Sequence, residues 1–211
     1  MKESSLRVIS GTTIVALTLF FIYCQSLFVA FSFIFIVGIV MAMEWNTITM
    51  ARKNSKTWLL FGIVYITCSL LPILRLKLMG PRGNHLLMWL FIIVWSMDTF
   101  AYLVGYALGL GKHKINSISP GKSYEGLLGG IFFSIIFGFI FSHLYMPEQE
   151  LVLLCITPVL CCLEQAGDFT ESYVKRTFGF KNSGDIIPGH GGFLDRFDGF
   201  LYINFLLLCI V

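Results

Sequence analysis

The sequence predicts an all-α fold, a polytopic transmembrane helical bundle of about seven helices. Of its 211 residues, 56% are hydrophobic, only 13% are charged, and Phe alone contributes 21. A water-soluble domain carries about 25% charged residues, so roughly half of the usual charge is missing. The composition excludes a nucleic-acid-binding module, a disulfide-rich secreted scaffold and a disordered regulator, since each needs more charge or more cysteine.

Seven apolar segments approach the length of about 20 residues that a transmembrane helix needs. They are residues 8–24, 27–43, 58–74, 86–110, 127–143, 151–163 and 199–211. The sixth segment is short, so we expect its helix to continue into the polar residues after Leu163. One face of that continuation would carry Glu164, Asp168, Ser172 and Lys175.

The basic residues are distributed unevenly between the two sides of this bundle. With the amino terminus inside, 12 of the 15 Lys and Arg residues fall on one side, which the positive-inside rule makes cytoplasmic. They are Lys2, Arg7, Arg52, Lys53, Lys56, Lys112, Lys114, Lys122, Lys175, Arg176, Lys181 and Arg196. Arg75, Lys77 and Arg82 are exceptions, and a re-entrant segment there would change the helix count. The sequence has no internal repeat, so we expect a single domain, with amino-terminal helices in residues 1–90 and the polar site in residues 91–211.

Half of the 12 acidic residues follow position 163. Asp195 and Asp198 are spaced i, i+3 at the start of the last helix, on one face, and Asp168 comes from the neighbouring helix. Carboxylate oxygens are ligands that suit Mg²⁺, so we predict a Mg²⁺ site at these three residues. The alternative for Asp195 and Asp198 is that they only stabilise the dipole at the start of the last helix. The alternative for Glu164 and Glu171 is that they lie in a solvated helix end.

Between these acidic residues, positions 187–198 read I-P-G-H-G-G-F-L-D-R-F-D. Gly189, Gly191 and Gly192 permit positive φ and let backbone amides approach a ligand, which is typical of a phosphate-binding turn. His190 has room to contact phosphate, although stabilisation of the turn is an alternative. Three nearby cations would strengthen such a site: Lys175, Arg176 and Lys181.

Asp98 lies in the middle of the fourth apolar segment. A charged residue there costs roughly 2.5 to 3.5 kcal/mol on insertion scales, so we expect Asp98 to face a polar cavity; a helix break is the alternative. Ala101 and Gly105 share its face and permit close helix contact. In the following loop, Ser119 and Lys122 belong to a second polar cluster, where Lys122 is placed to meet a phosphate.

Residues 172–198 resemble the signature of the phosphatidate cytidylyltransferases, also called CDP-diacylglycerol synthases. That signature reads S-x-x-K-R, four residues, K-D-x-G, and then P-G-H-G-G-x-x-D-R-x-D. The matching residues are Ser172, Lys175, Arg176, Lys181, Gly184, Pro188, Gly189, His190, Gly191, Gly192, Asp195, Arg196 and Asp198. Three upstream stretches, 98–102, 119–126 and 167–168, are similar to further motifs of the family. The resemblance covers the chain from about residue 95, and Asn182 departs from it by standing where the family usually has Asp.

The resemblance implies that CTP and phosphatidate react to give CDP-diacylglycerol and pyrophosphate in phospholipid biosynthesis. It implies Mg²⁺ at Asp168, Asp195 and Asp198, with room for a second cation such as K⁺. The implied catalytic residues are Asp168, Lys175, Arg176, His190, Asp195, Arg196 and Asp198. The implied substrate contacts are Asp98, Ser119, Lys122, Ser172, Lys181, Gly189, Gly191 and Gly192. We expect a multi-pass protein of the inner (cytoplasmic) membrane with its site facing the cytoplasm, surrounded by lipid, without nucleic acid; a homodimer would suit the family.

Two alternative functions stay open. A CTP-dependent lipid-alcohol kinase would phosphorylate a polyprenol instead of using phosphatidate. A transporter would use Asp98 and Glu164 in an ion pathway, although transporters often show internal repeats, which this sequence lacks. A non-catalytic membrane scaffold is the related alternative that Asn182 suggests.

Overall fold

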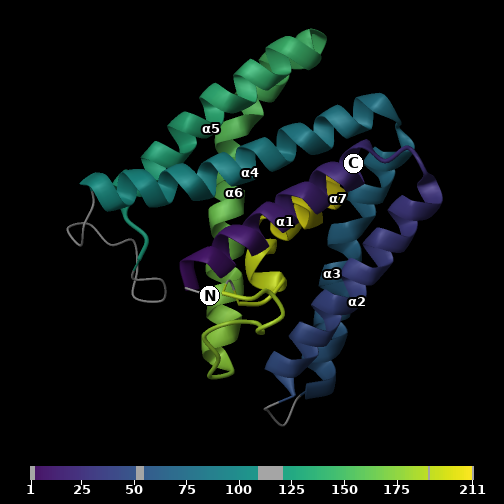
Figure 1. Ribbon diagram of the computed structural model, residues 1–211, viewed down its shortest axis with the longest axis vertical. Helices are drawn as coiled ribbons and strands as arrows, with labels where there is room; N and C mark the ends of the chain where they lie inside the picture. Colours follow the sequence, from purple (N-terminus) through teal and green to yellow (C-terminus); the bar gives the residue numbers. More distant parts are fainter. Residues whose placement is uncertain (1–2, 51–54, 109–120, 190, 211) are drawn as a thin grey trace.

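The computed structural model describes residues 3–50, 55–108, 121–189 and 191–210. In these ranges the chain forms seven α-helices and two short 3₁₀ helices, without a β-strand (Figure 1). The elements are α1 (Glu3–Tyr23), α2 (Leu27–Thr49), α3 (Ser55–Leu78), α4 (Pro81–Leu108), α5 (Tyr124–Tyr145), η1 (Pro147–Gln149), α6 (Glu150–Thr177), η2 (Leu194–Arg196) and α7 (Asp198–Ile210). The predicted all-α helical bundle is confirmed.

Helices α1 to α6 are each long and apolar enough to cross a membrane, so the chain is a multi-pass membrane protein. Helix α7 has 13 residues, fewer than a spanning helix requires, and it packs against α3 and α6. Helix α6 continues to Thr177 as predicted. Its polar end therefore extends the bundle beyond the apolar segment and meets the loop that leads into α7.

Helix α2 is longer than its apolar segment predicts, because it continues to Thr49. Residues 44–49 were expected in a loop, but Glu44, Trp45 and Ile48 are buried. Trp45 and Ile48 belong to a cluster of buried apolar residues that also contains Leu194 and Leu201 from the carboxy-terminal part of the chain. Tertiary packing thus stabilises the helical conformation of residues 44–49 at the end of α2, where the local hydropathy is lower.

Lys77, near the turn between α3 and α4, is one of the three basic residues that the charge distribution leaves opposite the cytoplasmic side, and the structure gives it a role. Lys77 is only 4% exposed, and its Nζ donates to the carbonyl oxygens of Phe21, Ile22 and Cys24 at 3.1, 2.8 and 3.0 Å. These carbonyls end α1, where a cation satisfies unpaired acceptors and the helix dipole. Helix α3 continues through Lys77 to Leu78, so the alternative of a re-entrant segment is wrong.

Helices α4 and α5 approach each other closely through small residues, as the sequence predicted. A Cβ added at Gly126 would lie 2.5 Å from the carbonyl oxygen of Ala101 and 3.3 Å from the Cα of Gly105. Tyr102, beside them in the sequence, is 71% exposed. Helix α4 is also continuous through Asp98, so the alternative of a helix break there is wrong.

Candidate functional site

The site is built where α6 crosses the start of α7. A Cβ at Gly167 would lie 2.5 Å from the Cβ of Tyr202 and 3.0 Å from the Cα of Gly199, while one at Gly199 would lie 2.7 Å from the Cγ of Glu164. The two backbones can meet only because both positions lack a side chain. Each glycine adjoins an acidic residue, so the crossing brings Asp168 and Asp198 to the same place.

We expect Gly167→Ala to loosen this crossing. Overpacking a close contact costs on the order of 1 to 3 kcal/mol, so the thermal unfolding temperature in detergent should fall. Gly121→Ala is the matched control, because nothing lies within 4 Å of a Cβ at Gly121. Equal unfolding temperatures for the two variants would contradict the close crossing.

Acidic side chains from three helices gather around the crossing. Asp98 of α4 is accessible, and Glu164 and Asp168 of α6 are among its charged neighbours. Burial and the nearby carboxylates of Glu171, Asp168 and Asp98 raise the pKa of Asp198 well above its usual range. Asp98 thus has charged neighbours and the described acids form one cluster, while the polar cavity expected around Asp98 stays a prediction.

Glu164 and Glu171 belong to this cluster rather than to a solvated helix end. They are 1% and 7% exposed, which rules out the solvated alternative. Glu171 Oε2 accepts a hydrogen bond from Lys175, whereas Glu171 Oε1 is buried and has no hydrogen-bond partner within the described structure. A buried acceptor without a donor is costly, and a bound cation would satisfy it.

Asp195 has a different environment from Asp198. Its carboxylate accepts hydrogen bonds from Lys175 Nζ at 2.5 Å, from the Ser183 amide at 2.9 Å and from the Gly192 amide at 2.9 Å. Burial opposes ionisation of this carboxyl, but these donors hold the pKa of Asp195 below its usual range. Asp195 therefore closes the glycine turn onto α6.

This arrangement bears on the three predicted Mg²⁺ ligands. Across the described ranges, no three His, Cys, Asp or Glu side chains are already gathered around one point that would hold a metal. Asp168 and Asp198 nevertheless share the acidic cluster, next to the unpaired oxygen of Glu171. A metal ligand role would require a cation to compete with Lys175 at Asp195 and with Lys122 at Asp168, and both roles stay predictions.

The glycine turn has the backbone geometry that the sequence indicated. Gly189 and Gly191 have φ of 77° and 87°, a region that favours glycine. The Ile187 amide donates to the Gly191 carbonyl at 2.9 Å and closes the turn. A Cβ at Gly192 would collide with the Ser183 hydroxyl. His190 and Ser119, both predicted site residues, lie outside the described residues.

Glu44 of α2 is a residue of this site that the sequence analysis missed. It is 3% exposed, and its carboxylate accepts hydrogen bonds from the amides of Phe193 and Leu194 at 2.8 and 2.7 Å and from the Ser183 hydroxyl at 3.2 Å. The amides belong to the start of η2, so Glu44 caps that turn from a helix near the other end of the chain. An isolated Glu at the end of an apolar segment was the available signal.

The predicted cations fall into two groups. Lys175 is buried between Glu171 and Asp195, and Lys122 pairs with Asp168 and donates to Gln165 at 2.8 Å. Three others are exposed at the surface near the turn: Arg176, Lys181 and Arg196. Ser172, predicted to contact substrate, donates from its hydroxyl to Asp168 at 3.2 Å.

The sequence of the whole region matches a known family. The model of the family described as "Cytidylyltransferase family" matches residues 60–211, which contain the acidic cluster and the glycine turn. The chain belongs to this family. In this member of the cytidylyltransferase family the candidate site is therefore assembled mainly from the matched region, and Glu44 adds to it from outside.

Relatives named phosphatidate cytidylyltransferase show how far the similarity extends. The Rickettsia prowazekii (strain Madrid E) protein is 34% identical over 97% of this chain and 90% of its own length. The Staphylococcus aureus (strain COL) protein is 46% identical over 60% of this chain, and the match spans about half, 48%, of that protein. The Bacillus subtilis (strain 168) protein is 36% identical over 74% of this chain and 60% of its own length. Similarity to cytidylyltransferases thus reaches well before residue 95.

Proposed function

We propose that the protein is a phosphatidate cytidylyltransferase that converts CTP and phosphatidate into CDP-diacylglycerol and pyrophosphate. The observation that carries this proposal is the convergence of Asp98, Asp168, Glu171 and Asp198 beside a glycine turn at the α6–α7 crossing. Carboxylates next to backbone amides suit a metal-bound triphosphate. The names of the relatives supply the substrate pair.

In this reaction a phosphate oxygen of phosphatidate attacks the α-phosphorus of CTP. One P–O bond forms there, the bond between the α-phosphorus and its bridging oxygen to the β-phosphate breaks, and pyrophosphate leaves with that oxygen. The attacking phosphate is already anionic, so the site needs charge neutralisation and alignment more than a general base. The chain offers acidic groups for a cation and basic groups for phosphates, in agreement with this need.

For Mg²⁺ we propose Asp168 and Asp198 as ligands, with the unpaired oxygen of Glu171 beside them; a second cation such as K⁺ would share the cluster. Mg²⁺ in such a site neutralises phosphate charge and orients the reacting groups. Asp195 keeps the glycine turn closed, so that its amides face the leaving pyrophosphate. Lys122 and Arg196 neutralise phosphate oxygens near Asp98.

We also propose that the site faces the cytoplasm, from the inner (cytoplasmic) membrane in bacteria that have two membranes. The excess of Lys and Arg on that side supports this orientation. CTP would arrive from the cytosol, and phosphatidate would arrive from the bilayer. A homodimer would need a surface other than the small-residue face of α4, because that face packs on α5.

The test follows label from α-labelled CTP into a chloroform-extractable lipid with purified protein in detergent micelles. We expect labelled CDP-diacylglycerol with phosphatidate and Mg²⁺, and no product with a polyprenol as acceptor. Chelation with EDTA should abolish the product, and excess Mg²⁺ should restore it. A lipid-alcohol kinase would transfer the γ-phosphoryl group and leave the α-label in CDP, so a parallel assay uses γ-labelled CTP with the polyprenol. Label in a polyprenyl phosphate in that assay would support the kinase instead. Full activity in EDTA would contradict the metal assignment.

A further inference from the structure

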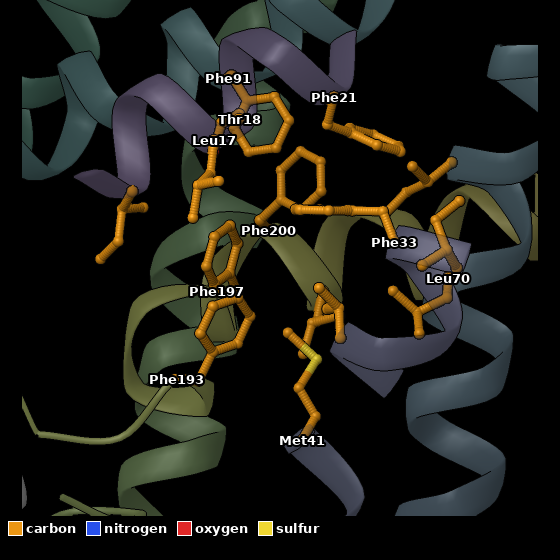
Figure 2. Close-up of a pocket in the computed structure, with 15 residues that line it drawn as sticks. Leu17, Thr18, Phe21, Phe33, Met41, Leu70, Phe91, Phe193, Phe197 and Phe200 are labelled. Atoms are coloured by element: carbon orange, nitrogen blue, oxygen red, sulfur yellow. The ribbon is translucent and has the colours of Figure 1, made fainter. Parts of the chain in front are cut away.

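A narrow apolar cavity lies among α1, α2, α3, α4 and α7, directly behind the glycine turn. Its lining residues surround about 620 Å³ of space free of protein atoms, part of which is open to the outside, and among the 15 lining residues only Thr18 has a polar side chain. Figure 2 shows side chains from α1, α2 and α3 pointing toward Phe193, Phe197 and Phe200 across this space. We propose that the cavity receives one acyl chain of the phosphatidate substrate, an inference that rests on the proposed function.

The cavity and the polar site share one wall. Phe193, Phe197 and Phe200 line the cavity, and they alternate along the chain with the acidic residues Asp195 and Asp198. Phe193 stacks on Phe197 with ring centroids 4.7 Å apart, and Phe200 stacks on Phe91 at 4.2 Å. The same short segment therefore presents carboxylates to the polar site and aromatic rings to the cavity, as a lipid with a phosphate head and an apolar tail requires.

The surroundings of the cavity favour an acyl chain over other apolar occupants. Four of the helices that line it, α1 to α4, are long and apolar enough to cross a membrane. Leu17 of α1 is both a lining residue and 48% exposed. The bilayer therefore borders the cavity at α1. An acyl chain is thinner than a partner's transmembrane helix, which is about 10 Å wide, and it is covalently attached to the phosphate that must reach the site.

The distance along α2 from Glu44 to Val37 gives a measure of how far the cavity extends from the glycine turn. It holds Phe193 and Leu194 at the turn, while Val37 lines the cavity seven positions earlier on α2. Seven helical residues correspond to about 10 Å. A short acyl chain would end before Val37, and a long chain would extend past it.

The first experiment fills the cavity at this depth with Val37→Phe. The added ring occupies roughly the space of two methylene groups, so kcat/KM for dioleoyl-phosphatidate should fall on the order of ten-fold relative to dihexanoyl-phosphatidate. Ile39→Phe is the matched control, because Ile39 is 45% exposed and lines a separate groove between α2 and α3. We expect Ile39→Phe to leave the ratio unchanged.

The second experiment needs no turnover. Phosphatidate with a diazirine at the end of one acyl chain is irradiated with the protein in the absence of CTP, and the labelled peptides are mapped by mass spectrometry. We expect adducts at Phe33, which lines the cavity and not the groove between α2 and α3, that excess dioleoyl-phosphatidate removes and dioleoyl-phosphatidylcholine does not. Adducts only on lipid-facing positions such as Phe28 and Phe35 would overturn the cavity assignment.

The two experiments separate the two proposals. Specific cavity adducts on a protein that forms no CDP-diacylglycerol would refute the proposed reaction while keeping the lipid site. Normal CDP-diacylglycerol synthesis, with equal losses for both chain lengths in Val37→Phe, would refute the acyl-chain site while keeping the reaction.

Discussion

Replacing Asp198 by Asn should lower kcat by at least about 100-fold, the size of effect seen when one preorganised electrostatic group is removed from an active site. Asp198 lies among Asp98, Asp168 and Glu171, and these acids with burial raise its pKa. In our proposal its carboxylate binds the Mg²⁺ that neutralises the triphosphate. The amide of Asn keeps the shape but loses the charge that holds the cation. The measurement is CDP-diacylglycerol formation at saturating CTP and phosphatidate over a series of Mg²⁺ concentrations.

The same substitution, Asp198→Asn, should not lower the thermal stability of the protein, although it lowers kcat. Because Asn removes a buried negative charge from a cluster of acids, the unfolding temperature of Asp198→Asn without metal should equal or exceed that of the wild type. The matched control is Glu148→Gln, at an exposed residue of η1 just before α6 begins, which should change neither quantity. Wild-type turnover in Asp198→Asn would refute its role as a metal ligand. A lower unfolding temperature would assign the loss of activity to misfolding.

The second large effect is expected at Glu44. Its carboxylate accepts two amides of the η2 turn and the Ser183 hydroxyl. In Glu44→Gln one oxygen becomes an NH₂ group that faces a donor, which costs about 1 to 3 kcal/mol. The turn should shift, and since misplacement of about 1 Å can cost on the order of 100-fold in rate, kcat should fall by at least about ten-fold.

The kinetic pattern distinguishes positioning from a general loss of structure. Because Glu44 holds the turn proposed to face pyrophosphate, KM for CTP should rise more than KM for phosphatidate, and Glu44→Ala should show a larger effect than Glu44→Gln. Glu148→Gln again serves as the control for an exposed glutamate. If Glu44→Gln lowers only the unfolding temperature, and the folded fraction keeps both kinetic constants, Glu44 stabilises the fold without positioning the turn.

The fold class and the position of the site follow from local features of the sequence. The apolar segments predict the helices because a membrane span needs a continuous run of apolar residues. Gly167 and Gly199 each adjoin an aspartate in the sequence. In the structure α6 and α7 cross at these two glycines, which places the two aspartates near each other. The continuation of α6 into its polar end was also predictable from the periodicity of its charged residues.

The environments of individual charged residues were decided by tertiary structure. Asp195 and Asp198 look equivalent in sequence, yet Asp195 is held by Lys175 and backbone amides while Asp198 lies among acids. Lys77 looked like an exception to the charge distribution, and it is a buried cap on the end of α1.

The sequence by itself determined a helical membrane protein of the cytidylyltransferase family, with its candidate site near the carboxy-terminal end. Only the tertiary structure showed that Glu44 joins the glycine turn and that an apolar cavity lies behind it. The physical reason is the range of the interactions. Hydropathy and motif spacing act over a few residues, whereas Glu44 and Phe193 are hydrogen bonded across 149 positions of the chain. Such a contact exists only after α2, η2 and α7 have packed together.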